Sequence, residues 1–356
     1  MPGLSATVYE SIDAVAANQW NHIVEQSDRG SIYQRTEWLA ALEQGLDLNG
    51  KHVVIEKNAE PVGVFPNLVV PLRLPDTVRE QVPDLIIERA KELASTRPGF
   101  GGPVLASNER KALELALSRL DAACGPKILS HYVRSPDVDY IRYAEQFEAQ
   151  GYTPNVSRCR PVIDLNREYD DILANMHKDR RYNIRKAREN NAEIVIQPPT
   201  IDVLRRFHAI YKETLDRVGA EPQPFAVFRE IAEQLDTAVQ IVTAKLDGKP
   251  VGQHFYLLDE IQSAIRHEFS AVTADNFQYY PSELIHEHMM QWGQVEGYRT
   301  YDFGPTPSNH EDGLFSYKNQ YGGTMLPILT WEQKQSPLWG LYAKTRTLYK
   351  RYSQEQ

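Results

Sequence analysis

A short sequence echo in the two halves of the chain constrains the fold more than any other feature. The sequence Ala-Glu-Pro-Val-Gly at residues 59–63 is matched 189 positions later by Gly-Lys-Pro-Val-Gly at residues 248–252. Each copy lies at the turn between two segments rich in strand-forming residues, so each predicts a β-hairpin. A turn followed by Pro-Val-Gly is common between strands, and the echo alone leaves coincidence open. Its matching place in each half favours two copies of one architecture.

Apolar periodicity predicts an α/β protein in both halves. In the first half we expect helices at 20–25, 37–43, 84–94, 109–123 and 138–149, and strands at 53–56, 62–72, 127–133, 152–158 and 161–165. In the second half we expect helices at 169–190, 201–217, 225–234, 282–296 and 314–320, and strands at 239–245, 250–258, 262–271, 300–303 and 324–331. We therefore predict an N-terminal domain at 1–160 and a C-terminal domain at 161–333, with a helix in 334–356 packing back on the first.

The composition excludes several classes of protein. With 356 residues, 42% hydrophobic and 24% charged, the chain has an ordinary globular balance and suits two domains. Its two cysteines allow no disulfide framework and no cysteine-based zinc site, which fits a reducing compartment. We find neither a signal-peptide pattern nor an 18-residue apolar run, and expect a cytoplasmic protein without a membrane span. A net charge of −9 argues against a general nucleic-acid coat, and we expect no DNA partner.

The segment 301–323 carries the leading candidate for chemistry. A strand ending in Asp-Phe-Gly at residues 302–304 places a glycine where backbone must approach a neighbour or ligand closely. A polar loop follows, and Lys318 then projects from a short predicted helix beside it. A lysine at such a place can stabilise negative charge that develops on an acyl oxygen. An exposed surface lysine is the alternative, and spacing alone favours that alternative.

Residues 178–188 form a basic segment in an acidic protein, with six lysines or arginines among eleven residues. At helical spacing Arg181, Arg185 and Arg188 share one face, and Lys186 lies on another. Such a helix suits the phosphates of a tRNA backbone or a nucleotide, so Arg181, Arg185 and Lys186 are our candidate phosphate ligands. A solvated helix paired with acidic neighbours is an equally good interpretation.

Arg217 lies at the predicted end of the helix 201–217. Its planar guanidinium can bind a carboxylate or a phosphate through two parallel hydrogen bonds. It can equally cap the last carbonyl groups of its own helix, and the sequence alone favours the cap.

The sequence predicts no metal site. His286 and His288 are two positions apart on a predicted helix and therefore point to different faces. His254, His267 and His310 have no ligand spacing with each other. The chain contains no Gly-x-Ser-x-Gly, P-loop or Gly-x-Gly-x-x-Gly motif, and no Ser/His/Asp triad is visible.

Taken together, several motifs resemble the Fem family of peptidoglycan-bridge aminoacyltransferases and its FemAB-like relatives in the GNAT superfamily. They are Arg181-x-x-x-Arg185-Lys186-Ala187, Thr214-x-x-Arg217, Tyr280-Pro281-x-x-Leu284, Tyr301-Asp302-Phe303-Gly304, Gly313-Leu314-x-x-Tyr317-Lys318-x-x-Tyr321-Gly322 and, in the first half, Gln34-x-x-x-Trp38. The resemblance is strongest from about Arg160 to Trp331. It implies two tandem GNAT-like (acyl-CoA N-acyltransferase) α/β domains, each a mixed, mostly antiparallel sheet flanked by helices, with the active cleft in or beside the second.

The resemblance also implies a reaction. An amino acid would pass from aminoacyl-tRNA, the donor substrate, to an amine of a lipid- or nucleotide-linked muropeptide, without a further cofactor. Lys318 would stabilise the charge of the reaction, Arg217 would bind the phosphate or carboxylate of the acceptor, and Arg35 would assist.

The chain departs from the family pattern around the expected cleft. The family's usual phenylalanine before the lysine is Tyr317, and His267 and Phe269 occupy a region where the family often has a tyrosine. A GNAT enzyme that uses acyl-CoA usually carries a glycine-rich loop for the pyrophosphate, but the loop 276–282 has no glycine. This loop contains Tyr280. Our candidate substrate contacts in this region are His267, Phe269, Tyr280 and Tyr317.

Three functions therefore stay open from the sequence. The leading hypothesis is aminoacyl-tRNA-dependent peptide-bond formation, with Asp302 or Glu268 as candidate acceptor of the amine proton. The second is acyl-CoA-dependent N- or O-acylation in envelope polysaccharide synthesis. The third is a non-catalytic GNAT-like module that only binds tRNA or a sugar nucleotide.

Overall fold

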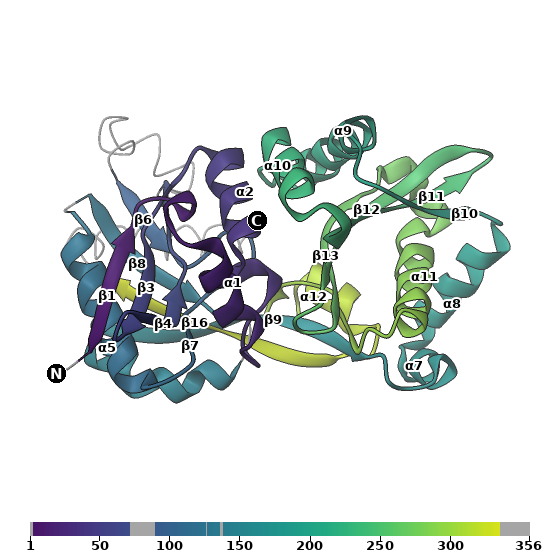
Figure 1. Ribbon diagram of the computed structural model, residues 1–356. Coiled ribbons are helices and arrows are strands. Elements are labelled where there is room, and N and C mark those ends of the chain that lie inside the picture. Colours follow the sequence, from purple (N-terminus) through teal and green to yellow (C-terminus); the bar gives the residue numbers. More distant parts are fainter. Residues whose placement is uncertain (1–2, 72–89, 126, 136–137, 335–356) are drawn as a thin grey trace, which may run out of the picture. The chain divides into compact units, whose positions relative to one another are not determined.

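The computed structural model describes residues 3–71, 90–125, 127–135 and 138–334, and the chain forms two compact units (Figure 1). The first unit comprises Met1–Glu43, Asp47–Asn155 and the chain from Leu329 onward, and the second comprises Gln44–Leu46 and Val156–Ile328. None of the described helices has the length and hydropathy that crossing a membrane requires.

The unit boundaries differ from the predicted positions 160 and 333 because two long strands pass through them. These are β9 (Tyr152–Asp164) and β16 (Thr324–Lys334), and each begins in one unit and ends in the other. We predicted a break in β9 between residues 158 and 161. The strand is continuous there. Pro161 has no N–H to donate, but its carbonyl accepts a hydrogen bond from the N–H of Phe303, so pairing continues through the proline. The predicted terminal helix lies outside the described residues.

The first unit contains two groups of strands. One sheet has the order β1 (Leu4–Tyr9), β3 (His52–Lys57), β4 (Glu60–Phe65) and β7 (Val104–Leu105). The other strands follow the order β16, β8 (Ile128–Arg134), β6 (Lys91–Ala94), β5 (Leu68–Pro71) and β2 (Asn49–Gly50). The helices are α1 (Ala17–Glu25), α2 (Thr36–Leu46), α5 (Glu109–Ala123) and α6 (Ala144–Ala149), with short 3-10 turns η1 (Ile12–Ala14), η2 (Ile32–Gln34) and η3 (Val138–Tyr143). The core includes Phe147 stacked on Trp331, with ring centroids 5.1 Å apart.

The second unit is built on the strand order β10 (Glu193–Gln197), β11 (Val239–Leu246), β12 (Lys249–Asp259), β13 (Ala264–Ala271), β14 (Thr300–Asp302) and β9, with β15 (Thr306–Pro307) also paired to β9. Neighbouring strands are antiparallel except β13 and β14. Its helices are α7 (Tyr169–Asn175), α8 (Lys178–Glu189), α9 (Ile201–Arg217), α10 (Phe225–Leu235), α11 (Pro281–Val295) and α12 (Gly313–Asn319), with turns η4 (Asp236–Ala238) and η5 (Ala274–Tyr279). Figure 1 shows α9 and α10 on one side of the central strands and α8 and α11 on the other.

The sequence echo corresponds to the same backbone irregularity in both units. In each hairpin the register shifts by one residue next to the Pro-Val-Gly sequence, so that Val62 of β4 and Val251 of β12 are extra, bulged residues. The turn residues before them, 58–59 and 247–248, all have positive φ angles. Positive φ at both central positions is the geometry of the tight turns that suit β-hairpins. The two halves therefore share a hairpin with matching turn and bulge, which supports duplication.

One predicted helix is wrong. The segment 84–94 was expected to be helical, but Lys91–Ala94 form β6, and residues 84–89 lie outside the described residues. In β6 the chain pairs with β5 and β8, and Leu93 is fully buried. A four-residue strand has too few side chains to show a period of two, so pairing with distant strands decides this segment.

Candidate functional site

A pocket of about 440 Å³ opens in the second unit and brings together several of the predicted residues. Lys318, Arg217, His267, Tyr280 and Tyr317 all line it. The other lining residues are Arg180, Asn183, Thr214, Ser270, Val272, Phe277, Pro281, Ser282, Glu283, His286 and Leu314. They come from α8, α9, β13, η5, α11 and α12, and from the short turns between these elements. A cavity of this size with convergent polar groups is typical of a small-molecule site.

Lys318 projects from α12 into the wall of this pocket and is buried. Its Nζ donates hydrogen bonds to the carbonyl oxygens of Phe303 at 2.6 Å, Gly304 at 3.2 Å and Pro305 at 3.1 Å. Burial lowers the pKa of this ammonium to about 8. An ammonium has three N–H donors, and all three are engaged by main-chain carbonyls. Lys318 therefore contributes positive charge to the pocket and holds the loop after β14.

Gly304 is required at this place, as the Asp-Phe-Gly sequence predicted. It has a φ of +71°, and a Cβ there would lie 2.8 Å from the carbonyl oxygen of His267. Any other residue would displace the loop from β13. The lysine and the glycine thus fix the same turn, one by hydrogen bonding and the other by close approach.

Arg217 ends α9 and extends into the pocket with an exposed side chain. Its guanidinium carbon lies 4.7 Å from the ring centroid of Phe277, which fits a cation–π contact. Among the described residues no carboxylate or carbonyl binds it, so the helix-capping alternative is not observed. The guanidinium remains available for an anion.

Tyr280 and Tyr317 both line the pocket. Tyr280 adopts a left-handed conformation with φ +53° just before Pro281 begins α11. The hydroxyl of Tyr317 lies 3.1 Å from that of Tyr321, and burial raises its pKa. Both line the pocket as the sequence predicted, while their contact with a substrate stays a prediction.

Three buried histidines lie together at the pocket, a grouping that sequence spacing did not indicate. They are His254 of β12, His267 of β13 and His286 of α11, and their nitrogen atoms lie within 4.8 Å of one another. Two of them, His267 and His286, line the pocket. Residues this far apart in sequence meet only because α11 packs on the face formed by β12 and β13.

The histidine cluster has a geometry that could hold a metal ion, but its surroundings favour a neutral hydrogen-bond network. Each ring is bonded to a hydroxyl oxygen, at 3.1 Å for His254–Ser282, 3.0 Å for His267–Ser270 and 2.5 Å for His286–Tyr301. Burial lowers the pKa of all three rings, and the charges of Arg180 and Lys318 lower the pKa of His286 further. Neutral imidazoles are the form that binds metals. The same two cations, however, repel an added cation.

Arg180 is a pocket residue that the sequence analysis missed. It is buried, forms an ion pair with Glu283 at the start of α11, and lies 4.3 Å from the ring centroid of Tyr317. The signal was present in the sequence, because Arg180 shares helical spacing with the apolar residues Ile184 and Ala187. The buried face of α8 therefore begins with an arginine.

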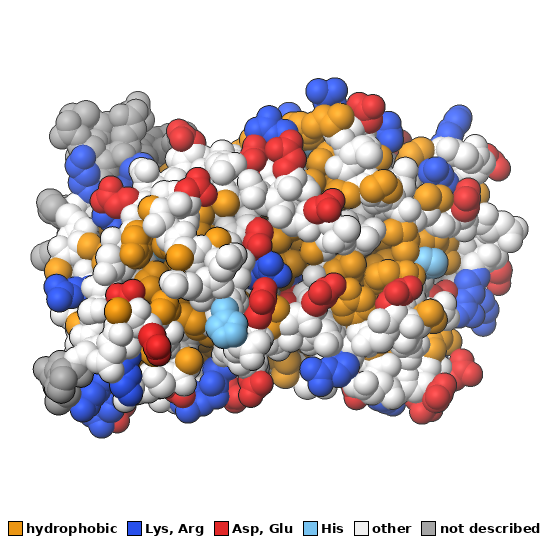
Figure 2. All heavy atoms as spheres, in the orientation of Figure 1, with side chains coloured by type: hydrophobic (Ala, Val, Ile, Leu, Met, Phe, Trp, Pro, Cys, Tyr) orange, Lys and Arg blue, Asp and Glu red, His pale blue; other side chains and the backbone are white. Residues whose placement is uncertain are grey.

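The predicted phosphate ligands on α8 are largely engaged within the protein. Arg181 donates hydrogen bonds to two carbonyl groups at the end of α7, and Lys186 pairs with Glu189 at 2.6 Å. Arg185 is exposed and lies over the ring of Tyr182 at 5.3 Å. Figure 2 shows lysine and arginine side chains interleaved with aspartate and glutamate over the face that it draws. The contacts fit the paired, solvated helix better than a dedicated phosphate surface.

Asp302 does not lie where a proton acceptor would be expected. It is buried outside the pocket lining, and its carboxylate pairs with Arg160 and with Arg266 at 2.9 Å. Burial on its own raises the pKa of this group, but the two arginines outweigh burial and hold the pKa below its ordinary value. A doubly paired carboxylate is a weak base, so the structure argues against the predicted catalytic role and assigns Asp302 to the core.

Phe269 is a second correction. Its ring packs against Phe228 at 5.0 Å, Tyr211 at 5.6 Å and Phe255 at 5.7 Å between centroids. These rings belong to α10, α9 and β12. Phe269 therefore faces the helices on the other side of the sheet from the histidines and is not a pocket residue.

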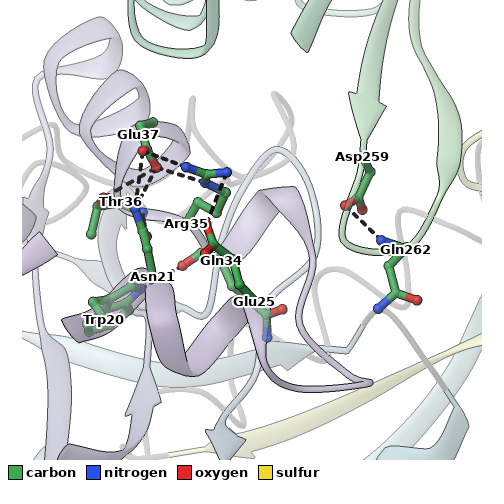
Figure 3. Close-up of polar contacts among 9 residues, drawn as sticks. All are labelled: Trp20, Asn21, Glu25, Gln34, Arg35, Thr36, Glu37, Asp259 and Gln262. Carbon is green, nitrogen blue, oxygen red and sulfur yellow. Dashed lines mark hydrogen bonds and ion pairs between the residues drawn. The ribbon is translucent and has the colours of Figure 1, made fainter. Parts of the chain in front are cut away.

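Arg35 lies in the first unit and is engaged there by two carboxylates (Figure 3). Its guanidinium lies 2.9 Å from Glu37 and 3.3 Å from Glu25. The neighbouring Gln34 is fully buried, and its carbonyl accepts a hydrogen bond from the indole of Trp20. The N-terminal motif thus serves packing in its own unit, and a role of Arg35 in substrate binding stays a prediction.

Comparisons with known proteins agree with this architecture. Residues 174–319 match a family model described as an acetyltransferase (GNAT) domain, and this range contains the whole pocket lining. Among curated proteins, none matches the sequence. Solved structures match its fold, beginning with FemX at 14% identity and a TM-score of 0.69, over 95% of this chain and 99% of that one.

Two further structures cover nearly the whole chain. L-PGS from Bacillus licheniformis has 12% identity and a TM-score of 0.61, over 97% of this chain and 99% of that one. A tandem GNAT protein from the clavulanic acid biosynthesis pathway has 11% identity and a TM-score of 0.55, over 94% and 99%. The prediction of tandem GNAT-like α/β domains is thereby confirmed. Residues 174–319 thus resemble an acetyltransferase (GNAT) domain, and the chain has the fold seen in FemX and in a tandem GNAT protein.

Proposed function

We propose that this protein transfers an aminoacyl or acyl group from an activated donor to an amine of an anionic cell-envelope precursor. The observation that carries the proposal is the single pocket that holds both the Lys318 charge and the free guanidinium of Arg217. The structural likeness to FemX and to L-PGS supports an envelope acceptor. A nucleotide- or lipid-linked muropeptide fits this description.

Arg217 is the proposed anchor for the acceptor. Among the described residues its guanidinium lies over the ring of Phe277 but has no hydrogen-bond or ion-pair partner, and Arg217 lines the pocket. A guanidinium edge binds a carboxylate or a phosphate through two parallel hydrogen bonds, which positions as well as attracts the ligand. The acceptor amine would then be held beside the reacting carbonyl.

The chemical demand on the pocket is modest because an ester or thioester donor is already activated. Alignment of two bound reactants can lower the barrier by roughly 7–11 kcal/mol in favourable cases. The positive charge of Lys318 adds electrostatic stabilisation of a tetrahedral oxyanion. The three N–H groups of Lys318 donate to main-chain carbonyls, so its positive charge acts on the oxyanion without a direct hydrogen bond. A direct hydrogen bond would require one N–H to leave its carbonyl.

Acyl-CoA is a second candidate donor, and one observation favours it over aminoacyl-tRNA. Most of the basic residues of α8 are bonded to carboxylates or carbonyls, which leaves little free charge for an RNA backbone. Against acyl-CoA, Pro281 offers no N–H at the start of α11, and the buried Glu283 adds negative charge there. Both donors therefore enter the experiment.

The test is a transfer assay with purified protein and labelled donors. Labelled aminoacyl-tRNA and acyl-CoA are each combined with a UDP-linked muropeptide, and RNase treatment should abolish transfer only from the tRNA. We expect Arg217→Ala to raise the KM for the acceptor with a smaller effect on kcat. Arg206→Ala, which removes another exposed arginine of α9 outside the pocket, is the control. An unchanged acceptor KM in Arg217→Ala would remove the assigned role.

A further inference from the structure

Two buried glutamates of α11 form similar ion pairs with arginines of α8. Glu283 pairs with Arg180, and Glu287, one turn further along α11, pairs with Arg188. Both carboxylate oxygens of Glu287 are hydrogen-bonded within the protein. Its Oε1 accepts from Arg188 at 2.5 Å and from the hydroxyl of Tyr169 at 2.6 Å, and its Oε2 accepts from Arg188 at 2.9 Å. Glu287 is therefore fully satisfied, and it does not line the pocket.

Glu283 uses only one of its oxygens within the protein. Its Oε1 accepts hydrogen bonds from Arg180 and, at 3.4 Å, from Nδ2 of Asn183. Among the described residues no group donates to its Oε2, although the residue is only 6% exposed and lines the pocket. Buried polar atoms in proteins are nearly always hydrogen-bonded. This oxygen is therefore an acceptor that a molecule bound in the pocket can satisfy.

Asn183 supplies a second acceptor in the same pocket. It is half-buried, and its amide nitrogen is the atom that contacts Glu283. In the described part of the chain, its Oδ1 has no hydrogen-bond partner. A ligand group with two or more N–H donors suits two acceptors of this kind, whereas a phosphate or a carboxylate has no N–H to offer.

The charges around Glu283 are compatible with an amino group. Glu283 is the only carboxylate among the described residues that line the pocket, and its pairing with Arg180 leaves Lys318 and Arg217 as the uncompensated cations. These cations repel a metal ion, which cannot change its charge. An α-amino group has an ordinary pKa of about 7.7–8.0, and nearby cations lower it further. The amine can thus bind in its neutral form and still donate an N–H to Glu283.

We propose that Glu283 binds the α-amino group of an aminoacyl donor and thereby selects aminoacyl groups over plain acyl groups. The inference rests on the proposed function for the transfer itself and names the class of its donor. A site that hydrogen-bonds an N–H of its substrate discriminates strongly against an analogue without that group, because the buried acceptor is then left unpaired. The same carboxylate repels the pyrophosphate of acyl-CoA at the start of α11.

The experiment is calorimetric titration of the full chain with two stable donor mimics that differ only in the amino group. The probes are 3′-(L-alanylamino)-3′-deoxyadenosine, which mimics the end of a charged tRNA, and 3′-(propionylamino)-3′-deoxyadenosine. We expect the wild type to bind the alanyl probe at least tenfold more tightly. Glu283→Gln should abolish this preference, because its amide keeps an oxygen for Arg180 and turns an N–H toward the pocket. Glu287→Gln, the matched change one turn away, should retain the preference.

Thermal unfolding checks that each variant is folded, and the wild-type comparison needs no substitution. Glu283→Asp is a second variant, which keeps the charge beside Arg180 and withdraws the carboxylate by one CH₂ group. It should weaken binding of the alanyl probe more than binding of the propionyl probe.

Equal affinity of the wild type for the two probes would overturn the inference, and so would a preference that both Glu283 variants retain. Failure of the proposed function has a different signature. Equal binding of both probes would leave a tRNA-linked donor in place and remove only the role of Glu283, whereas a wild type that binds neither probe would remove that donor together with the inference.

Discussion

Replacing Lys318 with methionine removes a buried ammonium and keeps a side chain of similar length. The ammonium has an ordinary pKa of 10.5 in the unfolded chain and a pKa of about 8 in the fold, mainly because burial disfavours its charge, with Asp302 and Glu268 partly offsetting burial. At 1.36 kcal/mol for each pH unit, this difference corresponds to roughly 3 kcal/mol. The folded wild-type protein bears that cost wherever the lysine is charged.

The sign of the pH dependence follows from the proton count in each state. Below about pH 8 the lysine is protonated in both the folded and the unfolded chain, and the cost is constant. Between about pH 8 and 10.5 only the unfolded chain holds the proton, so the free energy of unfolding rises with pH. Across this window the free energy of unfolding of the wild type should therefore rise by up to about 3 kcal/mol relative to that of Lys318→Met.

The assay is urea unfolding of both proteins at matched pH values from 7 to 10, followed by circular dichroism. Comparison at equal pH cancels the titration of every group that the two proteins share. Lys212→Met, which removes an exposed lysine of α9, is the control and should show no such trend. A difference between wild type and Lys318→Met that stays the same from pH 7 to 10 would show that the ammonium is not buried as the structure describes.

Three further predictions concern the same unit. Arg180→Met and Glu283→Gln should each destabilise the fold by about 3–5 kcal/mol, because each change leaves the buried charge of the other residue without its ion-pair partner. The double variant should be destabilised by less than the sum of the two, and additive effects in urea unfolding would contradict this. Gly252→Ala brings a Cβ within 2.7 Å of the Pro281 ring and should cost about 1–3 kcal/mol. Gly63→Ala, its counterpart in the first unit, has its closest contact, at 2.7 Å, with the end of the Leu105 side chain, and its next contacts are Ile55 at 3.1 Å and the Val104 carbonyl at 3.3 Å. It should cost less because a leucine end can move more readily than a proline ring, and equal costs would be the adverse result. Elemental analysis should find well below one metal ion per chain, since two cations oppose metal binding at the histidine cluster, and stoichiometric zinc removable by EDTA would refute that argument.

Local patterns were sufficient for the elements whose signals are local. The helices α5 and α9 have the bounds that apolar spacing predicted, and the two Pro-Val-Gly hairpins lie where the echo placed them. Gly304 follows the same logic, because a strand that ends in glycine points to a close approach of backbone. Lys318 and Arg217 were both correctly placed at a pocket, which motif resemblance indicated and spacing alone did not.

The missed features depend on contacts between segments distant in sequence. Asp302 was taken as a base, but only the fold brings Arg160 and Arg266 to its carboxylate. Phe269 and Ser270 could not be assigned to opposite faces of β13 without knowledge of the bulge at Glu268.

The sequence by itself therefore determined the duplicated α/β plan and two of the three cationic residues that line the pocket, because hairpins, helices and motifs depend on neighbouring residues. The tertiary structure alone decided which side chains share that pocket. The three histidines come from two strands and a helix, and a one-residue shift in pairing determines which face each strand residue occupies. Register and helix packing are set by the whole core, and no local segment contains that information.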